Sequence, residues 1–111
     1  MQLPNSAKAY IPIAKLTDYL LSETHAVGKT KARFFRSLGF DETNVGQLEW
    51  GLLAIARSGL VIDVTTSAHG TKYVIDGFLE APNGSVARVR TVWVTEARQE
   101  DPRFVTAYPV G

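Results

Sequence analysis

The residues best suited to chemistry lie in one short segment, residues 25–36, which reads HAVGKTKARFFR. A histidine side chain can take up or release a proton near neutrality because its ordinary pKa is about 6.5. Lysine and arginine bind phosphate oxygens. His25 is one of only two histidines in the chain, and no carboxylate separates it from the basic residues Lys29, Lys31, Arg33 and Arg36. The segment therefore combines a proton-transfer group with cations that suit a phosphate ester.

Composition excludes several other kinds of chemistry. The chain has no cysteine, which excludes a disulfide framework, a thiol nucleophile and a thiolate zinc site. The two histidines are not at helical spacing from each other, and the carboxylates are scattered. No P-loop, dinucleotide-binding fingerprint or serine-hydrolase elbow is present. We therefore expect no metal site and no cofactor.

Size and charge set further limits. The chain has 111 residues, of which 45% are hydrophobic and 21% are charged. These shares are typical of a folded globular protein, and the length suits one domain spanning residues 1–111. No apolar run approaches the roughly 18 residues that span a membrane, and the start lacks the apolar core of a signal peptide. These features predict a cytoplasmic protein with no membrane partner. Because the net charge is only +1, attraction for phosphate depends on how the charges are arranged.

The elements that must position these residues begin with helices, over about residues 12–59. Apolar residues at helical spacing predict a first helix over about 12–22. A second apolar stripe follows the basic segment, and Gly39 can end that helix as a left-handed cap, with Phe40 folding back on it. A third helix is predicted between Asn44 and Gly59.

Strands follow over about residues 60–110. Four segments rich in valine, threonine and aromatic residues predict strands at 60–66, 71–81, 85–96 and 103–110. The Asn83-Gly84 pair is typical of a tight hairpin, so the second and third strands are expected to be antiparallel neighbours. No helix remains to make parallel crossovers. The predicted fold class is therefore α+β, with N-terminal helices packed on one face of a four-stranded antiparallel β-meander.

Alternation along the last two strands indicates which side chains share a face of the sheet. In the third strand one face carries Val89, Thr91 and Trp93, and the other carries Arg88, Arg90, Val92 and Val94. In the fourth strand Phe104, Thr106 and Tyr108 are expected to point together. Either face carries polar groups at its middle, where a purely structural sheet more often carries aliphatic side chains.

Four motifs, KLTDYLL, HAVGKTKARFF, RVRTVWVTE and PRFVTAYPV, make the chain resemble a small bacterial family that is known as a domain of unknown function. The family's motifs fall on His25, Gly28 and Lys31, on Arg90, Thr91 and Trp93, and on Pro102, Arg103, Thr106 and Tyr108. The order of helices and meander is also loosely similar to that of the barnase/EndoU/colicin/RelE superfamily of metal-independent ribonucleases. Members of that superfamily include toxins of toxin–antitoxin pairs.

The resemblance implies a metal-independent endoribonuclease that cleaves RNA, such as tRNA or mRNA, and has a small antitoxin protein as its partner. Such cleavage needs a base for the ribose 2'-hydroxyl, cations for the phosphorane and an acid for the leaving 5'-oxygen. The implied catalytic residues are His25, Lys31, Arg90, Thr106 and Tyr108. The implied substrate-binding residues are Gly28, Lys29, Thr91, Trp93 and Arg103, with Trp93 stacking on a base. Whether His25 is the acid or the base stays open.

Each assignment has a structural alternative. Helical spacing pairs Lys29 with Arg33 and directs the other basic residues elsewhere, so part of the basic run is expected to be solvated surface. Trp93 lies in a valine-rich strand, where a tryptophan is more often a core anchor than a stacking platform. His69 is most simply a turn residue. The alternative function is a non-catalytic interaction domain that binds a protein or RNA through its open sheet, and it predicts that His25→Ala changes nothing.

Overall fold

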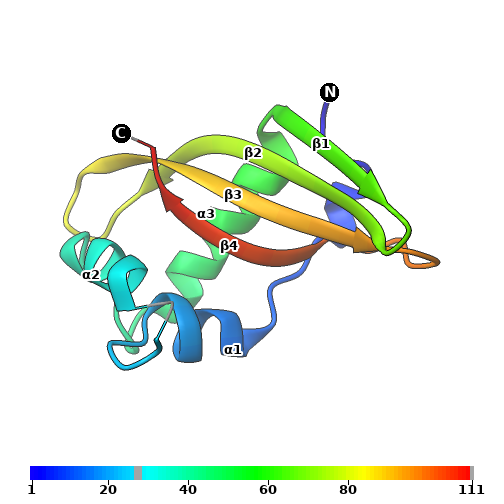
Figure 1. Cartoon of the computed structure of the whole chain (residues 1–111). Helices are drawn as coiled ribbons and strands as arrows, with labels where there is room; N and C mark the ends of the chain where they lie inside the picture. Colours follow the sequence, from blue (N-terminus) through cyan, green and yellow to red (C-terminus); the bar gives the residue numbers. More distant parts are fainter. Residues whose placement is uncertain (27–28, 111) are drawn as a thin grey trace.

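The computed structural model describes residues 1–26 and 29–110. Helices occupy the first half of the chain, and the second half forms one antiparallel sheet with the strand order β1-β2-β3-β4. In Figure 1, α3 lies against one face of the sheet, while α1 and α2 lie close to β4. This arrangement confirms the predicted α+β fold, with helices packed against an antiparallel meander. Within the described residues, no helix is long and apolar enough to cross a membrane.

The first predicted helix is present, but its second half is not α-helical. α1 (Ile13–Lys15) continues directly into a π-helical turn, η2 (Leu16–Leu20). The N–H of Leu21 donates to the carbonyl of Leu16 at 2.9 Å, which is the hydrogen bond of a π-turn. The wider turn lets Leu16, Leu20 and Leu21 all enter the core, where none of them has exposed surface.

The second helix, α2 (Lys29–Ser37), ends as the sequence predicts. Gly39 has a φ of 101°, a backbone conformation that glycine adopts readily. Its N–H donates to the carbonyl of Arg36 at 3.0 Å, and the N–H of Phe40 donates to the carbonyl of Phe35 at 3.2 Å. This pair of bonds is the Schellman motif, and Phe40 folds back until only 1% of it is exposed.

The third helix, α3 (Val45–Ser58), begins after Asn44 as predicted, but the Asn44 side chain does not cap it. Its amide oxygen accepts from the N–H of Asp41 at 2.8 Å, and its amide nitrogen donates to the carbonyl of Gly39 at 2.9 Å. Asn44 therefore fixes the turn between α2 and α3. On the buried side of α3, Leu48, Leu52, Ile55 and Ala56 pack into the core.

The strands are β1 (Val61–Ser67), β2 (Gly70–Glu80), β3 (Val86–Glu96) and β4 (Arg103–Pro109), all paired antiparallel with their neighbours. The β2–β3 hairpin closes at the predicted Asn83-Gly84 turn, where Gly84 has a φ of 87°. Because the turn sets the register, Asp76 of β2 lies directly opposite Arg90 of β3.

The predicted faces of β4 need a correction. Val92 pairs with Thr106 but Trp93 pairs with Phe104, so β4 holds one extra residue and forms a bulge. Phe104 therefore faces the core and is fully buried, while Thr106 and Tyr108 point to the opposite face. The prediction that these three residues share a face was wrong because alternation does not continue through a bulge.

The N-terminal residues, which precede the first predicted helix, pack against the rest of the chain. After a short 3-10 turn, η1 (Ser6–Lys8), Tyr10 forms a parallel bridge beside Arg103. The N–H of Tyr10 donates to the carbonyl of Pro102 at 3.0 Å. Leu3, Ala9 and Ile11 are buried, so this segment contributes to the core.

Candidate functional site

Tyr19 brings several of the chemically interesting side chains together. Its hydroxyl lies 3.0 Å from the hydroxyl of Thr106. The edge of its ring meets the His25 ring, with the ring centres 5.2 Å apart and the planes at 83°. The ammonium groups of Lys15 and Lys31 lie 5.0 and 5.7 Å from the centre of the same ring. We call Lys15, Tyr19, His25, Lys31 and Thr106 the Tyr19 cluster.

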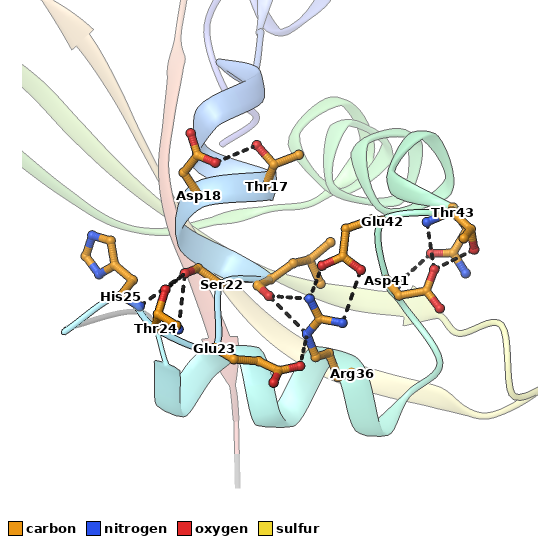
Figure 2. Close-up of polar contacts among 12 residues, drawn as sticks. Thr17, Asp18, Ser22, Glu23, Thr24, His25, Arg36, Asp41, Glu42 and Thr43 are labelled. Atoms are coloured by element: carbon orange, nitrogen blue, oxygen red, sulfur yellow. Dashed lines mark hydrogen bonds and ion pairs between the residues drawn. The ribbon is translucent and has the colours of Figure 1, made fainter.

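Local sequence places His25 next to α2. The Ser22 hydroxyl accepts from the N–H of Thr24 at 3.3 Å and from the N–H of His25 at 3.1 Å, which folds the residues after η2 into a turn. The carbonyl of His25 accepts from the N–H of Lys29 at 3.0 Å, at the start of α2. Figure 2 shows the His25 ring pointing away from the Arg36 guanidinium, at the other side of this loop. The backbone at His25 is thus held at both ends while its ring remains exposed.

The basic residues of α2 separate onto two sides of the helix. Lys31 points to the Tyr19 ring. Lys29 and Arg33 line a hollow of about 370 Å³ together with Glu23, Arg36 and Ser37. Residues two apart on an α-helix lie roughly 200° apart, whereas residues four apart lie on the same side. Lys29 therefore pairs with Arg33, as the helical spacing predicts, and does not share a side with Lys31.

Arg36 has a structural role. Its guanidinium donates to the carbonyl of Leu21 at 3.0 and 2.7 Å and forms ion pairs with Glu23 and Glu42 (Figure 2). The hydrogen bond to Glu42 is the main cause that raises the pKa of Arg36 above its ordinary value, and the charge of Glu23 adds to it. Arg36 therefore connects α2 to the segments on both sides of it and is not available to a ligand.

A second set of polar residues crosses the face of the sheet that lies away from the core. Arg90 forms a two-point ion pair with Asp76, with nitrogen–oxygen distances of 2.7 and 3.0 Å, and Arg88 approaches the same carboxylate at 3.4 Å. The Arg90 hydrogen bonds lower the pKa of Asp76 below its ordinary range. The pKa of Arg90 is raised, mainly by Asp76 and to a smaller extent by Tyr108, which lies opposite it on β4.

These two sets of residues meet on β4. Thr106 belongs to the Tyr19 cluster, and Tyr108 lies beside Arg90. Two residues along a strand span roughly 7 Å, and both side chains point to the same face. A phosphate group and the sugars on either side of it are long enough to contact both. The candidate site therefore runs from His25 across Thr106 to Arg90.

Two predicted substrate-binding residues, Thr91 and Trp93, lie in the core instead. Neither has exposed surface. The Trp93 indole N–H donates to the Thr91 hydroxyl at 2.9 Å, which donates to the carbonyl of Ile75 at 2.8 Å. The Trp93 ring also packs edge-on against Phe104, with centres 5.3 Å apart. A substrate cannot reach these side chains, so we do not retain them in the site.

The remaining predicted residues lie elsewhere. Arg103, at the start of β4, donates to Glu96 at 2.9 Å, at the end of β3, whereas Arg90 lies near the middle of that strand. Four residues of strand separate those two arginines, which is roughly 13 Å. Gly28 lies outside the described residues. The structure therefore brings His25, Lys31, Thr106, Tyr108 and Arg90 together, and leaves Arg103 at a distance.

Three residues of the site escaped the sequence analysis: Lys15, Tyr19 and Asp76. Lys15 and Tyr19 are four residues apart in the first predicted helix, a spacing that places two side chains side by side. Asp76 and Arg90 are equally far from Asn83, on which the hairpin loop is centred, whereas a two-residue Asn83-Gly84 turn would have placed Asp76 opposite Thr91; the sequence alone therefore did not pair them. Within residues 1–26 and 29–110, no group of three or more metal-binding side chains lies close enough together to hold a metal ion.

Comparison with known proteins identifies a family and a solved structure of similar fold. The model of a domain of unknown function (DUF6883) matches residues 2–111. No curated protein sequence matches the chain. One chain of a contact-dependent growth inhibition toxin–immunity protein complex from Klebsiella pneumoniae 342 has a similar structure, with a TM-score of 0.75 and 19% sequence identity. The alignment covers 96% of this chain and 97% of that chain. At this identity the similarity concerns the fold.

Proposed function

We propose that this chain, which belongs to the DUF6883 family of domains of unknown function, is a metal-independent endoribonuclease that acts as a toxin. The observation that carries the proposal is the Tyr19 cluster. A histidine, two lysines and a hydroxyl come from three separate segments of the chain, and all contact one tyrosine. Such a combination supplies a proton-transfer group, cations and a hydrogen-bond donor within one small area.

The proposed reaction is the attack of a ribose 2'-hydroxyl on the adjacent phosphorus. A base takes the 2'-hydroxyl proton, the 2'-oxygen forms a bond to phosphorus, and the bond from phosphorus to the 5'-oxygen breaks as an acid protonates that oxygen. The products are a 2',3'-cyclic phosphate and a 5'-hydroxyl. His25 serves as either the base or the acid, because the residue is exposed and an imidazole group can both accept and donate a proton.

The other residues of the site act on the phosphate. Lys31 and Lys15 place positive charge where the phosphorane gains negative charge. Thr106 and Tyr108 offer hydroxyl groups that donate hydrogen bonds to phosphate oxygens. Arg90 is already bound to Asp76 through two nitrogens and lies directly opposite Tyr108 on β4, so in this proposal it has a positioning role beside Tyr108. Tyr19 is a positioning residue, because it acts through the groups that contact it.

The toxin role is supported by the fold shared with one chain of the growth inhibition toxin–immunity protein complex. In this proposal, a small antitoxin or immunity protein binds the chain and covers its site. Expression of the chain without that protein is expected to arrest growth. His25→Ala is expected to relieve the arrest, and so is Arg90→Ala, because loss of Arg90 releases Tyr108.

The test is to incubate the purified protein with total RNA and with tRNA in EDTA, and to map the ends produced. We expect the wild type to leave 2',3'-cyclic phosphates on RNA and to leave DNA uncut, because DNA has no 2'-hydroxyl. His25→Ala is expected to cleave at least about 100-fold more slowly, as is usual for loss of a general acid or base.

The matched control is His69→Ala. His69 is the other histidine of the chain, is exposed, and lies in the turn between β1 and β2, where its N–H donates to the Ser67 hydroxyl. This variant is expected to cleave like the wild type. Cleavage at the wild-type rate by both His25→Ala and His69→Ala would count against the proposed site. Loss of cleavage in both variants would point to a general effect on folding.

A second candidate function is a non-catalytic protein-binding domain. Trp50 of α3 and Phe78 of β2 are 74% and 71% exposed and line one hollow of about 330 Å³ with Gln47, Gly51, Ala54 and Glu80. Exposed aromatic side chains beside a hollow are common in protein interfaces. This function predicts no cleavage of any RNA and no effect of His25→Ala in any assay. The cleavage test therefore distinguishes the two functions.

A further inference from the structure

A basic hollow lies on the side of α2 that faces away from Lys31. It is lined by Glu23, Lys29, Arg33, Arg36 and Ser37 and has a volume of about 370 Å³. Lys29, Arg33 and Ser37 follow one another at four-residue spacing, so they project from the same side of the helix. Arg36 and Glu23 form the part of the lining nearest the turn before α2 (Figure 2).

The charges in this hollow are not balanced. Arg36 is paired with Glu23 at 3.0 Å and also with Glu42, so the positive charge of Arg36 is fully compensated by these two carboxylates. Within residues 1–26 and 29–110, neither Lys29 nor Arg33 takes part in an ion pair. Both residues are exposed, so they can reach a ligand without breaking an ion pair. The hollow therefore offers an anion two cations that form no ion pair among the described residues, and the side chains of its lining carry a net positive charge.

The hollow adjoins the Tyr19 cluster through the backbone. The N–H of Lys29 donates to the carbonyl of His25 at 3.0 Å, so one residue of the hollow is hydrogen-bonded to the proposed acid or base residue. Lys31, two residues later, belongs to the Tyr19 cluster on the other side of the helix. A flexible polyanion whose reacting phosphate lies beside His25 can therefore continue past the start of α2 and into the hollow.

We infer that the basic hollow binds backbone phosphates of the RNA strand next to the cleaved linkage. Single-stranded RNA suits this surface because its phosphates repeat along the strand. When one phosphate lies beside His25, the two unpaired cations can bind the neighbouring phosphates whatever the base sequence. The inference rests on the proposed RNA substrate. It assigns to Lys29 and Arg33 a role in binding, separate from the chemistry at His25.

The experiment measures binding of a short single-stranded 2'-O-methyl RNA, which lacks a free 2'-hydroxyl and cannot be cleaved. Its affinity is measured at several salt concentrations for the wild type, for Lys29→Gln with Arg33→Gln, and for His25→Ala. Arg57→Gln is the matched control, because Arg57 is an exposed arginine on α3 and lies outside the hollow. Circular dichroism checks that all variants are folded, which is expected for changes at exposed residues.

Loss of two phosphate contacts is expected to make the slope of log affinity against log salt shallower by about 1.4, at roughly 0.7 per contact. Between about 1 M and 0.1 M salt, the affinity of the wild type is therefore expected to rise about 25-fold more than that of the double variant. His25→Ala and Arg57→Gln are expected to keep most of the wild-type slope. In the cleavage assay, the double variant is expected to raise KM while kcat stays close to that of the wild type.

An unchanged salt slope in the double variant, with binding otherwise intact, would overturn the inference while leaving the ribonuclease proposal in place. The same result together with loss of binding to an acidic protein partner would assign the hollow to that partner. Failure of every form to bind RNA would instead overturn the proposed function and the inference with it.

Discussion

Tyr19→Phe and Tyr19→Leu separate the two ways in which Tyr19 holds the site. Phenylalanine keeps the ring beside His25, Lys15 and Lys31 but removes the hydroxyl that meets Thr106 at 3.0 Å. Leucine removes the ring contacts as well. If the ring positions the histidine and the lysines, the two substitutions must differ in activity by more than they differ in stability.

The magnitudes follow from the contacts. A partly buried hydrogen bond contributes about 0.5–1.5 kcal/mol, so Tyr19→Phe is expected to lower the free energy of unfolding by about 1 kcal/mol. For a chain of this size, that is a fall of roughly 4 °C in Tm. Tyr19→Leu also loses an edge-on ring contact, worth about 0.5–1.5 kcal/mol, and two cation contacts of about 0.5 kcal/mol or more each.

The assay combines urea denaturation with RNA cleavage per folded molecule. Tyr19→Phe is expected to slow cleavage by less than about 10-fold, whereas Tyr19→Leu is expected to slow it about 100-fold, because small displacements of catalytic groups are costly. A double-mutant cycle of Tyr19→Phe with Thr106→Val should give a coupling energy of about 1 kcal/mol. Equal cleavage by the two Tyr19 variants would refute the role of the ring, and a coupling energy near zero would refute the hydrogen bond.

Three other predictions concern the framework of the site. Thr91→Val leaves the Trp93 indole N–H without its acceptor and is expected to lower the free energy of unfolding, measured by urea denaturation, by about 1–3 kcal/mol. Cleavage per folded molecule is expected to stay unchanged. Reduced cleavage with unchanged stability would instead show that Thr91 belongs to the site. The pKa of Asp76 is lowered, so its pairing with Arg90 adds stability above about pH 4, and this stability is lost as pH falls through the folded-state pKa. Between about pH 5 and pH 2, Asp76→Asn is therefore expected to lose less stability than the wild type. Parallel acid-denaturation curves for the two proteins would contradict this. Gly39→Ala forces a side chain onto a residue with a φ of 101° and places its Cβ 3.1 Å from the Cβ of Pro82, so thermal unfolding should show a loss of about 1–2 kcal/mol, and an unchanged Tm would argue against the strained cap.

Much of the fold can be predicted from the sequence because it depends on contacts between near neighbours. Apolar spacing predicts the helices, and the Gly39 cap and the Asn83-Gly84 turn depend on a few adjacent residues. The antiparallel pairing of β2 with β3 follows from this turn, but the loop is centred on Asn83, and only the structure shows that Asp76 lies opposite Arg90. Membership in the family of unknown function could likewise be recognised from short motifs, and the family model matches residues 2–111.

The candidate site is only partly predictable in the same way. The sequence identified His25, Lys31, Arg90, Thr106 and Tyr108 as residues of interest. In the structure, His25, Lys31 and Thr106 contact Tyr19, and Tyr108 and Arg90 follow Thr106 on the same face of the sheet. The sequence could not show that Tyr19 contacts His25, Lys31 and Thr106, because the first two contacts depend on how the turn after η2 folds and the third joins residues far apart in the chain. Nor could it show that Arg90 is already bound by a carboxylate.

The sequence by itself therefore determined the order of the elements, the helix ends and the hairpin, since each depends on backbone preferences over a few residues. Tertiary structure alone decided three features. The π-turn at Leu16–Leu20 brings three leucines into the core, and the bulge in β4 buries Phe104 while turning Thr106 outward. The packing of α2 sends Lys31 to Tyr19 and Lys29 to the basic hollow. These outcomes depend on filling one shared core, which no local pattern of residues specifies.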